Sequence, residues 1–180
     1  AREKMEASRE ISLRLGMDIA ALYAEVGLSR LASIESNLDQ ASIHLENAVQ
    51  LFESSKSESD ERKVKILIQQ ALIECRRGNY STALESALQA NRMADISGFA
   101  WERIEALRIL GMSYSGMGDF DKAQPFLTES LELAQNQGDQ YQSAQALLET
   151  SQMYLAWAES QTPDQDSKLA LAQDAIHRSI

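Results

Sequence analysis

A spacing of about 40 residues recurs along this chain and restricts its possible folds more than any other feature. Gly118 and Ala123 have counterparts 40 positions earlier in Gly78 and Ala83. The same register relates Gly138 to Gly98, Ala134 to Ala94, and Tyr154 to Tyr114. Periods of roughly 20–50 residues are typical of repeat proteins, whose units bury their apolar sides only by stacking on their neighbours.

The amino-acid composition predicts that each repeat unit is helical. Ala, Leu, Glu, Gln and Ser dominate the chain, and its 180 residues include only 8 Gly and 2 Pro. Apolar residues recur at helical spacing, as in the stripe Phe120, Ala123, Leu127, Leu131 and Ala134. We therefore predict an all-α fold, an α-solenoid of antiparallel helix pairs that forms a right-handed superhelix. A helix over 2–15 precedes about eight paired helices over 18–35, 38–54, 61–77, 80–96, 99–117, 120–136, 140–159 and 167–179.

The stretch that joins two of these helices shows how a pair is built. Gly118 is predicted to take a positive φ in the turn, and Asp119 is predicted to cap the helix that follows. Small residues at Gly111 and Ala123 are predicted to let the two helices approach closely.

The repeats suggest one domain over 1–180. A half repeat over about 1–16 precedes four repeats over about 17–58, 59–98, 99–138 and 139–180. Two connectors are irregular: a polar loop over 54–60 and a Pro-bearing insertion over 161–166. We expect the chain to be a piece of a longer protein, because it begins half a repeat late. The apolar side of helix 2–15, with Met5, Ile11 and Leu15, would then be uncovered, which predicts self-association through this end.

Charge and hydropathy exclude several classes of partner. The net charge is −10 without a basic stripe, so direct nucleic-acid binding is not expected. No apolar run reaches the ~20 residues that span a bilayer, so no membrane partner is expected. Cys75 is the only cysteine, so an internal disulfide is impossible and the expected location is the cytoplasm. A lone Cys in a helix is predicted to be a small buried hydrophobe.

No catalytic or metal motif is present in the sequence. His44 and His177 lie far apart, without Cys or His at ligand spacing, and neither a nucleophile elbow nor a phosphate-binding glycine loop occurs. We predict no enzymatic activity and no cofactor. The aromatic residues that follow the core register are predicted to pack inside: Trp101, Trp157, Tyr114 and Tyr154.

One copy of the repeat carries a recognisable pattern: Leu110-Gly111 with Tyr114, then Gly118-Asp119-Phe120, then Ala123 with Ser130. It resembles the tetratricopeptide repeat family, and its period is similar to that of the longer, 40-residue subclass of kinesin light chains and of MalT-like or Rap-like regulators. Other copies depart from the pattern, with Ser29, Ala71 and Ser151 in place of the first Gly.

The resemblance implies a superhelix whose first helices line a concave groove that binds peptides. Transferred by register, the expected groove residues are Arg30, Lys65, Ile68, Leu72, Arg76, Arg108, Met112 and Gln152. The four cations among them favour a helical or extended peptide with acidic side chains. The alternative is that these cations only pair with carboxylates of the same surface, namely Glu74, Glu102 and Glu105.

The predicted function is that of a protein–protein interaction scaffold that binds a peptide or helix of a partner. The alternative is a sensory or regulatory module that controls an attached output domain, such as a transcription regulator or a signalling enzyme. The chaperone-tail clamp of the family is not expected, because Ile68 and Leu72 occupy two of its polar positions.

Overall fold

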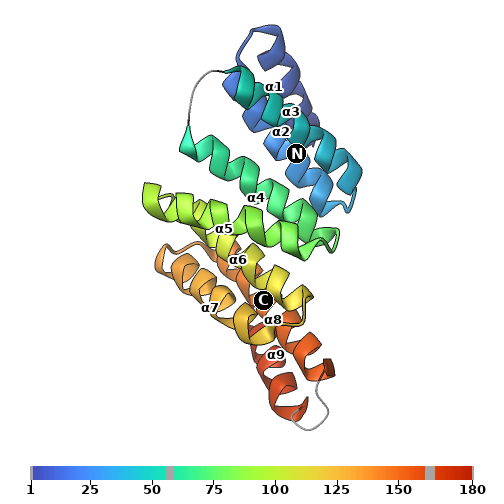
Figure 1. Cartoon of the computed structure of the whole chain (residues 1–180), viewed down its shortest axis with the longest axis vertical. Helices are drawn as coiled ribbons and strands as arrows, with labels where there is room; N and C mark the ends of the chain where they lie inside the picture. The colour runs from blue at the N-terminus through green and yellow to red at the C-terminus, as the bar shows by residue number, and fades with distance from the viewer. Residues whose placement is uncertain (1, 56–58, 161–164, 180) are drawn as a thin grey trace.

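The computed structural model describes residues 2–55, 59–160 and 165–179, and these residues form nine helices and no strands (Figure 1). The helices are α1 (Arg2–Arg14), α2 (Asp18–Ile34), α3 (Leu38–Ser54), α4 (Asp60–Arg76), α5 (Tyr80–Ser97), α6 (Ala100–Gly116), α7 (Phe120–Asn136), α8 (Gln140–Ser160) and α9 (Gln165–Ser179). Each predicted helix is present, and its ends lie within two residues of the predicted ones. The all-α fold class is therefore confirmed.

The helices stack as successive pairs along the long axis of the molecule (Figure 1). The pairs are α2 with α3, α4 with α5, α6 with α7, and α8 with α9, and α1 packs against α2. The first helices of neighbouring pairs also contact one another in the order α2, α4, α6 and α8. This arrangement is that of an α-solenoid, in which each pair is stabilised by the pairs beside it.

The turns follow the predicted chemistry. Gly118 has a φ of 78°, and the Asp119 side chain accepts a hydrogen bond from the main-chain N–H of Lys122 at 3.4 Å. The turn between α2 and α3 uses Ser36 in the left-handed region instead, with a φ of 61°. Asn37 then caps α3 by accepting a hydrogen bond from the N–H of Gln40.

Small residues bring paired helices together, as predicted. A Cβ added to Gly111 would lie 2.5 Å from Cγ of Leu127 and 3.2 Å from the carbonyl oxygen of Ala123. The repeated small residues of the second helices are fully buried, and the hydroxyl of Ser130 donates to the carbonyl of Ile104 at 2.9 Å. Because no space remains for a larger side chain, these positions determine how closely α6 and α7 pack.

The first helix is partly covered. Met5 packs on Gly27 of α2, where an added Cβ would lie 3.0 Å from the Met5 sulfur. Ile11 and Leu15 are exposed, as predicted, whereas Met5 is half-buried. The predicted loop over 54–60 and insertion over 161–166 fall partly on residues 56–58 and 161–164, which lie outside the described part of the chain.

Candidate functional site

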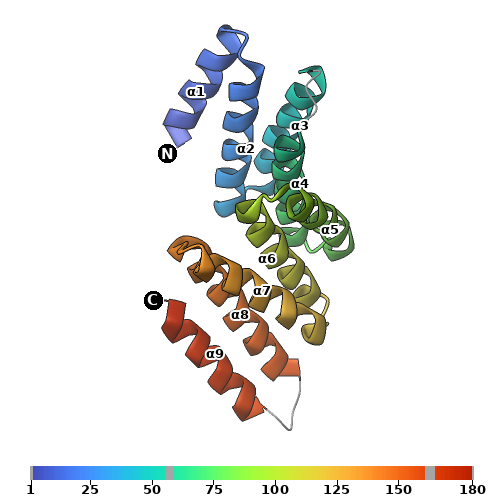
Figure 2. The same ribbon diagram turned by 90° about the vertical axis from the view of Figure 1, so that its left-hand side faces the viewer.

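The candidate site lies on the surface formed by the first helices, which we call the inner face. Figure 2 shows that the stack bends, so that α1 with α2 and α8 with α9 lie on the same side of the molecule. Because the repeat steps by 42, 40 and 40 residues, equivalent side chains form rows across the four helices. One such row is Arg30, Leu72, Met112 and Gln152.

A hollow of about 110 Å³ lies on the inner face, where all four helices converge. Its lining residues are Arg30 and Ile34 of α2, Leu72 and Arg76 of α4, Arg108 of α6, and Tyr141, Gln145, Leu148 and Glu149 of α8. The bend of the solenoid brings α2 and α8 to the same hollow. Four predicted groove residues therefore meet at one place: Arg30, Leu72, Arg76 and Arg108.

Arg108 forms the floor of this hollow together with Glu149. Nη1 of Arg108 lies 3.4 Å from Oε1 of Glu149, and the Arg108 side chain is 5% exposed. Burial lowers the pKa of the Arg108 guanidinium, although Glu149 opposes this shift. Burial also raises the pKa of Glu149, against the attraction of Arg108 and Arg76. Each charge is thus held in a poorly solvated position mainly by the other.

Arg76 is the cation of the hollow that is not bound to a carboxylate. Its Nη1 donates to the carbonyl oxygen of Ser33 at 2.6 Å, which fixes the guanidinium at the edge of the hollow. The ion pairs among the described residues do not include Arg76; it acts on Glu149 only by lowering the pKa of that carboxyl. The remaining N–H groups of this guanidinium are available for a carboxylate from outside.

Arg30 is bound on two sides. Its guanidinium pairs with Glu105 of α6, which is 3% exposed, and stacks over Trp101 with 5.6 Å between the Arg30 Cζ and the ring centroid. The prediction that Trp101 packs in the core is wrong, since this side chain is 39% exposed and its Nε1 donates to Asp139 at 3.0 Å. Trp101 occupies the first turn of α6, at the end of the helix, where its ring is only partly covered.

Lys65 lies outside the hollow. Its ammonium pairs with Glu102 of α6 and, at 3.5 Å, with Glu61 on its own helix. Burial alone would lower the pKa of the Lys65 ammonium. The hydrogen bonds and negative charges of Glu102 and Glu61 outweigh this effect, so the pKa of Lys65 is raised. Glu102 and Glu105 therefore pair with cations of this surface, as the alternative interpretation expected, whereas Glu74 pairs with Arg77.

The other predicted groove residues have different surroundings. Ile68 is 4% exposed and belongs to the core between α4 and α6, so it offers no surface to a ligand. Met112 is half-buried, with its sulfur 3.3 Å from Nη1 of Arg108. Gln152 is exposed but lies beyond the hollow. Cys75 is buried as predicted, and burial raises the pKa of its thiol.

The same register also places Ile34, Gln145 and Leu148 among the groove positions, so two residues of the hollow were missed, Tyr141 and Glu149. Tyr141 lies on its rim, and its hydroxyl accepts a hydrogen bond from Nε2 of Gln145 at 2.7 Å. Stepping Trp101 forward by 40 would have found Tyr141, because both stand one residue after the start of their helices. No sequence pattern predicted that Glu149 would lie in the hollow, because its position among the Arg side chains depends on the bend of the solenoid.

Residues with metal-binding or membrane-spanning character were searched for within the described ranges. Among residues 2–55, 59–160 and 165–179, no three His, Cys, Asp or Glu side chains are grouped so as to hold a metal ion. Within the same ranges, none of the helices has both the length and the apolar character needed to cross a membrane.

Comparisons with known proteins identify the fold. No family model matches this sequence, and no curated protein matches it either. Among solved structures, the chain is similar to the crystal structure of BtubC (BKLC) from P. vanneervenii, with a TM-score of 0.65 and 15% sequence identity. The match covers 99% of this chain and 85% of the other. At this identity the similarity describes the fold alone, and the helical solenoid is shared along nearly the whole chain.

Proposed function

We propose that this chain is a tetratricopeptide-like interaction scaffold that binds an acidic peptide or helix of a partner protein in the hollow of the inner face. The observation that carries the proposal is Arg76, a guanidinium fixed by the Ser33 carbonyl at the edge of the hollow and not paired with a carboxylate. Arg binds carboxylates through two parallel N–H groups, so an Asp or Glu side chain of a partner complements this position.

The charge of the hollow supports an acidic ligand. Three guanidinium groups line it, those of Arg30, Arg76 and Arg108, and one carboxylate, that of Glu149. Glu105 neutralises Arg30 from outside the hollow, and Glu149 neutralises Arg108. One positive charge therefore remains, on a chain whose net charge is −10.

Exposed apolar side chains around the hollow supply the area that a peptide needs. Ile34 is 55% exposed, Tyr141 56% and Leu148 48%, although all three line the hollow. Aromatic and Arg side chains beside a concave site are typical of the residues that dominate binding energy. A peptide with an acidic residue next to an apolar one fits this arrangement. A cytoplasmic location, compatible with a single buried thiol, is part of the proposal.

The test is direct binding of the purified chain to an array of peptides that combine acidic and apolar residues. Copies in which each Asp or Glu becomes Asn or Gln serve as the ligand control. Arg76→Glu should abolish binding to the acidic peptides. Arg108 is unsuitable for reversal, because it is buried against Glu149 and its loss would disturb the fold.

The matched control variant is Arg77→Glu, one residue further along the chain. Arg77 points to the other side of α4, where it pairs with Asp39 and Glu74. Arg77→Glu should leave binding unchanged while altering the net charge by the same amount. Acidic peptides that bind equally well to both variants, or amide copies that bind as tightly as the acidic peptides, would refute the proposal.

A further inference from the structure

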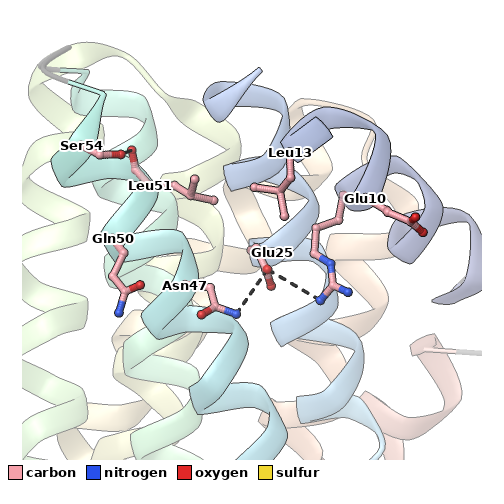
Figure 3. A pocket seen from close by; sticks show the side chains of 8 residues that line it. Glu10, Leu13, Glu25, Asn47, Gln50, Leu51 and Ser54 are labelled. Carbon is pink, nitrogen blue, oxygen red and sulfur yellow. Dashed lines mark hydrogen bonds and ion pairs between the residues drawn. The ribbon is translucent and has the colours of Figure 1, made fainter. Parts of the chain in front are cut away.

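A second pocket, of about 570 Å³, lies between α1 and α3 with α2 as its floor, away from the hollow of the inner face (Figure 3). Two helices face each other across it. Leu13 of α1 and Leu51 of α3 form apolar walls, and Figure 3 shows Glu25 of α2 between them. Asn47 and Gln50 of α3 add polar groups to the lining.

Glu25 is a buried carboxylate whose two oxygens have different partners. The residue is 3% exposed. Its Oε2 accepts a hydrogen bond of 2.6 Å from Nδ1–H of His44. Its Oε1 has only longer contacts, 3.3 Å to Nδ2 of Asn47 and 3.8 Å to a guanidinium nitrogen of Arg9. Hydrogen bonds between a cation and a carboxylate are ordinarily about 2.7–2.9 Å, so Oε1 is weakly satisfied.

His44 occupies one oxygen of this carboxylate. Its Nδ1 faces an oxygen that only accepts, and its Nε2 lies 3.2 Å from Nε2 of Gln40, an amide nitrogen that only donates. The guanidinium paired with Oε1 is that of Arg9, which is too distant for a hydrogen bond and whose side chain is 33% exposed.

From this geometry we infer that the pocket between α1 and α3 is a binding site for a lysine side chain of a polypeptide partner. The ammonium group would bind Oε1 of Glu25, and the methylene chain would lie between Leu13 and Leu51. Lysine fits better than arginine because one oxygen of the carboxylate is already held by His44. A single weakly bound oxygen suits a point charge, whereas the arginine fork requires two oxygens.

The experiment is an NMR titration of the 15N-labelled chain with blocked lysine, Nα-acetyl-lysine N-methylamide. Saturable shifts of the amides around Glu25 and Asn47 are expected. Blocked norleucine, which lacks the ammonium group, should produce none, and blocked arginine should bind more weakly. Equal shifts with norleucine or equally tight binding of arginine would overturn the assignment. A titration with n-pentylamine distinguishes a lysine side chain from a free small amine as the ligand. If pentylamine binds and blocked lysine does not, the ligand is not a lysine of a polypeptide, and that part of the proposal is overturned.

Two variants test the charge of the site in opposite directions. Glu25→Gln should weaken blocked lysine about tenfold or more, because a charged hydrogen bond is lost. Arg9→Ala removes the competing cation from a partly exposed position and should strengthen binding roughly two- to threefold. Arg9 is partly exposed, so Arg9→Ala does not alter the core of the protein. This variant therefore remains informative if the buried change Glu25→Gln prevents folding.

The control is Glu10→Gln, on the rim of the same pocket. Glu10 is exposed and pairs with Arg14 at 2.9 Å, so this change alters the local charge without touching the floor. Glu10→Gln should bind blocked lysine within about twofold of the unmodified chain. Weaker binding by Arg9→Ala, or an equal loss in Glu10→Gln and Glu25→Gln, would contradict a site centred on Glu25.

Discussion

Arg30 of α2 pairs with Glu105 of α6, although α4 lies between these helices along the solenoid. The same guanidinium stacks over Trp101, at the start of α6. The first helix pair is therefore tied directly to the third across the inner face. This connection crosses the inner face at the hollow, which Arg30 lines.

Removing Arg30 should destabilise the chain by about 3 kcal/mol, because it leaves a buried carboxylate without its cation. Glu105 is 3% exposed, and Arg30 is the cation paired with it in the described part of the chain. Arg30→Ala would be compared with the unmodified chain by urea unfolding. The double variant Arg30→Ala with Glu105→Gln should regain part of the loss, since the orphaned charge is gone. A double variant less stable than Arg30→Ala would contradict this assignment.

Gly111 and Gly27 should respond differently to the same substitution. An Ala at Gly111 meets Leu127 and the Ala123 carbonyl, so Gly111→Ala should cost about 1–2 kcal/mol of unfolding free energy. An Ala at Gly27 meets only the flexible thioether end of Met5. The helix propensity gained there, up to about 1 kcal/mol, should offset the contact, so Gly27→Ala should be near neutral. Thermal or urea unfolding checks both, and the reverse order would contradict the packing described.

Glu149 should make stability fall as pH rises. Burial raises its pKa in the folded chain, so the folded state holds this proton at pH values where the unfolded state has released it. Unfolding free energy therefore decreases as pH rises from the ordinary glutamate range, near 4.3, through the raised pKa, and is constant above it. Glu149→Gln should remove this slope. Urea midpoints measured across this pH range compare the two chains, and identical slopes would mean that Glu149 titrates normally.

The local structure of this chain could be predicted from its sequence because it depends on local chemistry. Gly118 predicted a turn because glycine readily takes a positive φ, and this φ is present. Asp119 predicted a helix cap because its side-chain oxygen can accept a main-chain hydrogen bond, and this bond is present too. Gly111 and Ala123 indicated a close approach, which is also present. The 40-residue period placed the helix ends within two residues, because glycine turns recur at that spacing, Gly78 with Gly118 and Gly98 with Gly138.

The candidate site could be predicted only in part, because it depends on the bend of the whole stack. Register assigned Arg76 and Arg108 to the groove, and both line the hollow, but it did not identify the partner of Arg108 on α8. The convergence of α2 and α8 results from small rotations added over several pairs, which no local pattern encodes. Trp101 was assigned to the core from its register, yet it lies in the first turn of α6 and is 39% exposed, with Arg30 stacked over its ring.

The most direct test of the central claim is the footprint of a bound acidic peptide on the 15N-labelled chain. The best acidic ligand from the peptide array would be titrated, and its amide shifts mapped onto the helices. The proposed site predicts that the largest shifts occur at Ile34, Arg76, Tyr141 and Leu148, around the hollow. Shifts confined to α3, α5 and α7, or an array in which no acidic peptide binds, would contradict it.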